Sequence, residues 1–108
     1  MKKTLAAVAV ILTLGASTAA NAVVSFGNTD CGTWINKSSP AQRVWLNGYM
    51  SALNAIMYAK IGRDALKPIQ SAEQLHAWMD NYCRAHPLKM VDEGAFMLLD
   101  ELLTSAGK

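Results

Sequence analysis

The sequence contains few of the residues that catalysis or metal binding requires. It has two cysteines and two histidines among 108 residues, and no glycine-rich phosphate loop, internal repeat or alternating strand pattern follows residue 22. His76 and His86 lie too far apart for a usual zinc-site spacing, and no third group that would orient a cysteine–histidine pair is apparent. We therefore expect no enzyme activity, no metal and no cofactor.

A basic patch is also missing. The formal net charge of +2 comes from Lys2 and Lys3, because the remaining Lys and Arg residues balance the eight Asp and Glu residues. Residues 23–108 thus carry no formal net charge. Nucleic acids and anionic membrane surfaces both bind clustered basic side chains, so we expect neither as a partner.

The one long apolar run lies at the N-terminus. Lys2 and Lys3 precede apolar residues 5–14, and small residues follow as far as Ala22. This order is typical of a secretory signal peptide, and the run is shorter than the ~20 residues that a membrane-spanning helix needs. We expect a signal peptide over 1–22, cleaved after about Ala22 or alternatively after Ala20. Residues 23–108 should then form one exported helical domain that does not insert into the membrane.

Both cysteines lie in the part that we expect to be exported. An oxidising compartment favours pairing, and two cysteines allow one intramolecular bridge, so we expect a disulfide between Cys31 and Cys83. Closing so long a loop stabilises a domain by about 4 kcal/mol in the chain-entropy model. For so small a domain this is a large share of the free energy of unfolding.

Periodicity and capping signals predict an all-α fold, a small bundle of about four helices. Residues 23–29 show no period, and we expect an extended arm there. A helix of about two turns should follow over 31–37, with Thr29 or Asp30 as its cap.

A sharper start signal follows. Ser39 precedes Pro40 at a first helical position, and Gln42 stands three residues after the serine, as in a capping box. A long helix should therefore begin here, run to about Lys60 and stop at Gly62.

The third and fourth helices are predicted from similar signals. Residues 62–70 break the helical period, and we expect a loop with about one turn. Ser71 and Gln74 repeat the capping-box pattern, and the helix that they open must end before Pro87. The last helix should start near Pro87 and end at Gly107.

Apolar residues at steps of three and four predict which face of each helix is buried. Gly48 lies within the stripe of the second helix, where we expect a neighbouring helix to approach the backbone closely. The predicted core stripes are Cys31, Trp34 and Ile35; then Trp45, Tyr49, Ala52, Leu53 and Ile56; then Leu75, Trp78, Met79 and Tyr82; then Leu88, Val91, Ala95, Leu98, Leu99 and Leu102.

Other residues with functional potential have simpler structural interpretations. Four carboxylates of the last helix could supply an acid–base pair, but they share one helix and are better interpreted as a solvated face. The tryptophans could stack on a ligand, but each falls on a predicted core stripe, and we expect His76 to face solvent. The four carboxylates are Asp92, Glu93, Asp100 and Glu101, and the tryptophans are Trp34, Trp45 and Trp78. Because the sequence shows no cluster of reactive residues, we favour a protein that acts by binding another protein.

Three segments resemble the Rap/Tai family of type VI secretion immunity proteins. They are Cys31-Gly-Thr-Trp34, Trp45-Leu-Asn-Gly48-Tyr-Met-Ser-Ala-Leu-Asn54 and Trp78-Met-Asp-Asn-Tyr-Cys83-Arg-Ala-His-Pro87-Leu. The resemblance implies a periplasmic helical protein that binds and neutralises a secreted effector, often a peptidoglycan amidase, without catalysis of its own. The matching residues are expected to be mostly scaffold.

The partner of such a protein would be a secreted toxin or hydrolase. We expect it to contact the loop over 62–70, through Arg63, Asp64 and Lys67, because binding residues favour exposed loops on a rigid scaffold. A homodimer is also compatible with the sequence.

A periplasmic acid-stress chaperone of the HdeA type is the alternative interpretation. Such a protein is also small, helical and singly bridged, and it exposes apolar surface when protonation loosens the fold. The eight carboxylates of this chain could support that behaviour, because protonating paired carboxylates destabilises a native state.

Overall fold

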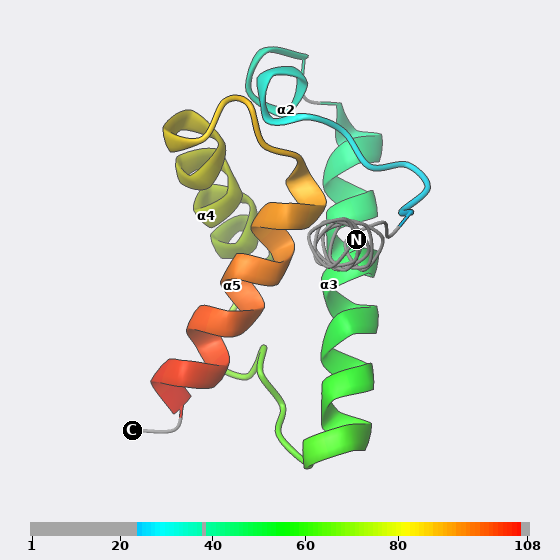
Figure 1. Cartoon of the computed structure of the whole chain (residues 1–108), viewed down its shortest axis with the longest axis vertical. Helices are drawn as coiled ribbons and strands as arrows, with labels where there is room; N and C mark the ends of the chain where they lie inside the picture. The colour runs from blue at the N-terminus through cyan, green and yellow to red at the C-terminus, as the bar shows by residue number, and fades with distance from the viewer. Residues whose placement is uncertain (1–23, 38, 107–108) are drawn as a thin grey trace, which may run out of the picture.

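The computed structural model describes residues 24–37 and 39–106 (Figure 1). Within these ranges the chain forms four helices, so the prediction of a small all-α bundle with one disulfide is confirmed. The helices are α2 (Cys31–Lys37), α3 (Pro40–Ile61), α4 (Ala72–Ala85) and α5 (Val91–Ala106). The signal peptide predicted over 1–22 and the predicted helix end at Gly107 lie outside the described residues.

The long helix α3 extends along the molecule, and α5 lies between α3 and α4 (Figure 1). Helix α5 packs against both of these neighbours, while the short α2 lies across one end of the bundle and packs mainly on α4. The core is formed where these four helices meet. Its buried apolar residues are Cys31, Trp34, Leu46, Met50, Ala65, Leu75, Met79, Cys83, Val91, Ala95, Leu98, Leu99 and Leu102.

The ends of α3 follow the local signals in the sequence. The Gln42 backbone N–H donates to the Ser39 hydroxyl at 3.3 Å, and the Ser39 N–H donates to the Gln42 side chain at 3.3 Å, so the predicted capping box is confirmed. At the other end Gly62 adopts φ +69°, a left-handed conformation that glycine tolerates best, and its N–H donates to the Tyr58 carbonyl at 2.8 Å.

Helix α4 begins as predicted, with one difference in its cap. The Ser71 hydroxyl accepts from the Gln74 N–H at 3.2 Å, but the Gln74 side chain accepts from the Gln70 N–H at 2.7 Å, one residue earlier than a capping box requires. The helix ends before Pro87, with His86 as its C-cap. The cap therefore also fixes the last residue of the preceding loop.

The N-terminal arm is joined to two parts of the fold. The Cys31 N–H donates to the Lys89 carbonyl at 2.9 Å, and the Val91 N–H donates to the Thr29 carbonyl at 2.8 Å. These bonds surround an isolated antiparallel bridge between Asp30 and Met90. The arm thus pairs with the segment that leads into α5, while the disulfide from Cys31 joins the same place to α4.

Asp30 is the cap of α2, one of the two residues that the sequence left open. Its carboxylate accepts from the Thr33 hydroxyl at 2.6 Å and from the Thr33 N–H at 3.0 Å. These hydrogen bonds, the hydroxyl bond above all, hold the pKa of the Asp30 carboxyl below its ordinary value.

The predicted core stripe of α3 was partly wrong, because Trp45, Tyr49 and Leu53 pack against the core but lie at its edge. Leu46 and Met50 are the fully buried residues of this helix, whereas Trp45 and Tyr49 are half-buried and Ile56 is 52% exposed. Ala52, also in the predicted stripe, is exposed. The buried stripe, with Leu46 and Met50, and the predicted stripe both have helical spacing, and we predicted burial for the one that carries the aromatic rings. The rings lie at the edge of the bundle, where the arm covers them.

Two further expectations about packing were wrong. Gly48 is exposed, and a Cβ atom there would have no neighbour within 4 Å among the described residues. The close approach occurs at buried Gly94 of α5, where a Cβ would lie 2.7 Å from the Tyr82 ring and 2.8 Å from the Met79 sulfur. Leu88 is 97% exposed because residues 87–89 form a turn and α5 begins only at Val91.

These two glycines form a matched pair for a stability test. We expect Gly94→Ala to lower the free energy of unfolding by about 1–3 kcal/mol, because its methyl group overpacks the contact between α4 and α5. Gly48→Ala should raise the free energy of unfolding by up to about 1 kcal/mol, because alanine favours an exposed helix. Urea unfolding followed by circular dichroism measures both. Equal stability of Gly94→Ala and the wild-type protein would contradict the packing described here.

Candidate partner-binding site

The loop between α3 and α4 is fastened to the bundle by Asn54. The side-chain carbonyl of this residue accepts from the Ala65 N–H at 2.7 Å and from the Leu66 N–H at 3.2 Å, while its amide donates to the Asp64 carboxylate at 2.8 Å. Ala65, itself part of this loop, is buried. A single side chain of α3 therefore satisfies three polar groups of the loop and holds it in one conformation.

The structure gives the three predicted contact residues different roles. The Arg63 guanidinium donates to the Leu103 carbonyl in α5 at 2.6 Å, and the Asp64 carboxylate accepts from Asn54. Both side chains thus contribute to anchoring the loop, whereas Lys67 is exposed on its surface. Contact of these residues with a partner stays a prediction.

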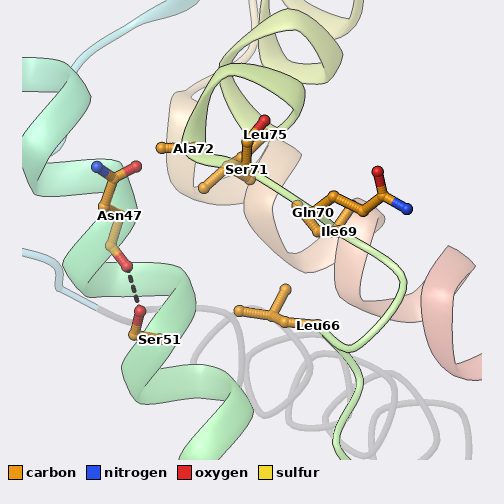
Figure 2. Close-up of a pocket in the computed structure, with 8 residues that line it drawn as sticks. All are labelled: Asn47, Ser51, Leu66, Ile69, Gln70, Ser71, Ala72 and Leu75. Carbon is orange, nitrogen blue, oxygen red and sulfur yellow. Dashed lines mark hydrogen bonds between the residues drawn. The ribbon is translucent and has the colours of Figure 1, made fainter.

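A pocket of about 350 Å³ lies between this loop, α3 and the first turn of α4 (Figure 2). Leu66 extends from the loop toward Ser51 of α3, while the Gln70 amide points away from α3 (Figure 2). Apolar side chains from the loop and α4 face hydroxyl and amide groups of α3 across it. The lining residues are Asn47, Ser51, Leu66, Ile69, Gln70, Ser71, Ala72 and Leu75.

The polar wall of the pocket is ordered by hydrogen bonds within the bundle. The Ser51 hydroxyl donates to the Asn47 carbonyl at 2.7 Å, and the Asn47 side-chain oxygen lies 2.8 Å from His76 Nε2. The expectation that His76 faces solvent was wrong, because this side chain is half-buried. Its ring centroid lies 6.3 Å from that of Trp34 in an edge-to-face arrangement. Asn47 is thereby held in place by α4.

The pocket is lined entirely by uncharged side chains. Its lining contains no acid, base or nucleophilic thiol, and across the described ranges no three His, Cys, Asp or Glu residues are grouped so that they could hold a metal ion. Hydroxyl and amide groups opposite apolar side chains suit a peptide side chain together with its backbone polar groups.

Sequence reasoning missed Asn54 and Asn47 as parts of this site. Asparagine is a poor helix former, so its presence inside a long helix is a reason to look for a hydrogen-bonding partner of its side chain. The signal is not specific, because Asn81 also lies inside a helix and its side chain accepts a bond from Arg84 of the same helix. It also cannot say which loop or helix Asn47 and Asn54 bind, because their partners lie 10 to 29 residues away in the sequence.

Comparison with known proteins finds no match to this chain among family models, curated proteins or solved structures. None of the helices in the described part of the chain combines the length and the apolar character needed to cross a membrane.

Replacing Asn54 tests whether it holds the loop. We expect Asn54→Ala to lower the free energy of unfolding by about 2–3 kcal/mol, because it removes three hydrogen bonds and leaves partly buried N–H groups unpaired. Asn81→Ala is the matched control, since Asn81 lies in a helix and its side-chain oxygen accepts one exposed bond from the Arg84 guanidinium. Urea unfolding gives the stability of both variants, and equal values would show that Asn54 does not anchor the loop.

Proposed function

We propose that this protein is a periplasmic immunity-type protein that binds and neutralises a secreted effector. A peptidoglycan amidase is the effector class that the resemblance to the Rap/Tai family implies. The observation that carries the proposal is the pocket of about 350 Å³ beside a loop that the protein itself holds in place.

A fastened loop suits an inhibitor. A flexible loop would lose conformational entropy when it binds, and that loss would weaken the complex, whereas a loop already ordered avoids most of it. Asn54 and Arg63 hold the loop from α3 and α5. Lys67 lies exposed on the same loop and supplies a charge for recognition of an acidic group.

The residues that carry the family resemblance also build this site. In the α3 segment from Trp45 to Asn54, Asn47 lines the pocket and Asn54 anchors the loop, while Leu46 and Met50 form the core beneath. The segment therefore contributes to the binding surface as well as to the scaffold. This is consistent with the proposal, because residues of the resembling segment line the pocket and order the loop beside it.

Filling the pocket tests the proposal. We expect oxidised, tagged protein to capture one stoichiometric hydrolase from envelope extract and to inhibit that hydrolase when both are purified. Ser51→Trp should weaken the complex at least tenfold, because its indole occupies the pocket. Ala55→Trp is the control, since Ala55 is exposed on α3 and is not part of the pocket lining.

A charge reversal gives an independent check on the loop. Lys67→Glu should weaken the same complex, while Lys37→Glu, an exposed change at the end of α2, should not. Arg63 and Asp64 are less suitable for this test, because altering either also breaks a loop anchor. If the pure protein failed to inhibit any captured hydrolase, the immunity function would be wrong. Capture of many unfolded proteins at pH 2 to 3 would instead favour the acid-stress chaperone.

A further inference from the structure

A second groove, of about 370 Å³, lies on another part of the surface, between the end of α4 and the first turns of α5. It shares no residue with the pocket beside the loop. Its apolar wall includes Phe96, which is 46% exposed, and Met97, which is 54% exposed. The lining residues are Tyr82, His86, Lys89, Glu93, Phe96 and Met97.

The formal charges of this lining cancel, because it contains one lysine and one glutamate. Lys89 Nζ lies 3.7 Å from the Glu93 carboxylate, and both side chains are about half exposed. An exposed pair of this kind contributes little to stability, and each member retains hydrogen-bonding capacity for a second partner. The groove therefore suits an occupant that is apolar where it meets Phe96 and Met97 and that brings one charge of each sign.

One apolar side chain projects beside the groove. Leu88 is 97% exposed, the largest fraction among the large apolar side chains of the described residues. Its turn is ordered at both ends, because the Lys89 N–H donates to the His86 carbonyl at 3.1 Å and the Cys31 N–H donates to the Lys89 carbonyl at 2.9 Å. A fixed backbone thus presents a leucine to solvent, as it presents the anchor residue of a protein interface.

We propose that this surface is an interface between two copies of the chain, in which Leu88 of each copy enters the groove of the other. A single patch carries both halves of this contact, because Leu88 lies between two residues that line the groove, His86 and Lys89. A patch that contains an anchor and its receiving groove closes a dimer about a two-fold axis with no further surface. A second copy also brings one lysine and one glutamate to the neutral lining.

The order of these residues along the chain fits such an axis. Leu88 and Lys89 come first, Glu93 follows in the first turn of α5, and Phe96 and Met97 come last. When two copies meet in antiparallel directions, each Leu88 lies opposite the end with Phe96 and Met97, and each Lys89 faces Glu93 of the other copy. The inference goes beyond the proposed function and does not depend on it, because the two sites share no residue.

Sedimentation velocity of the oxidised, exported protein tests the inference. We expect a dimer whose population rises with protein concentration. Leu88→Ser should weaken this association roughly tenfold or more, because it removes the anchor. Ile56→Ser is the matched control, since Ile56 is an exposed apolar residue of α3 outside the groove, and it should leave the association unchanged. Circular dichroism shows that each variant is folded.

Two charge reversals separate contacts between copies from the pair within one copy. Lys89→Glu alone and Glu93→Lys alone should each weaken the dimer roughly tenfold or more, because like charges then face each other across the axis. An equimolar mixture of these two variants should recover it, because opposite charges meet again. The inference is overturned by a monomer at about 1 mM protein, by an unweakened Leu88→Ser dimer, or by a mixture that recovers nothing.

Discussion

The buried disulfide between Cys31 and Cys83 is the constraint on which the rest of this structure depends. It joins the start of α2 to the end of α4, with the two Cα atoms 4.7 Å apart. The backbone bonds around Asp30 and Met90 join the same point to the start of α5. The N-terminal segment thus connects two helices that the sequence places more than 40 residues away. In so small a domain, a covalent link at this junction replaces apolar contacts that a larger core would provide.

Trp34 shows how this junction is filled. Its indole is buried one turn after the half-cystine, its N–H donates to the Asp80 carboxylate at 2.8 Å, and the Arg43 guanidinium lies 5.2 Å from its ring. Residues of α3 and α4 therefore meet on one side chain of α2. Because His76 touches the same ring and also orients Asn47, the junction extends to the wall of the pocket beside the loop. The pocket wall and the scaffold are therefore parts of one network of contacts.

Much of the fold could be predicted from the sequence, because its signals are local. The capping box at Ser39 and the stop at Gly62 each depend on residues within one helical turn, and counting cysteines is enough to pair them. The rotational position of α3 and the role of Gly48 could not be predicted, since both depend on which helices pass nearby. The loop over 62–70 was predicted correctly as a loop, but Arg63 and Asp64 anchor it to the bundle. Their partners, Leu103 and Asn54, lie in α5 and α3, so the sequence could not indicate this role.

Hydrogen exchange of the oxidised and reduced proteins is the most direct test of this account. In the oxidised protein, the amides of Cys31 and Val91, which bind carbonyls across the junction, should exchange as slowly as those in the core of α4. Reduction should remove about 4 kcal/mol of stabilisation and with it the protection of these amides and of α4. If the reduced protein kept the oxidised pattern of protection at both amides, the disulfide would not be the constraint that holds the fold together.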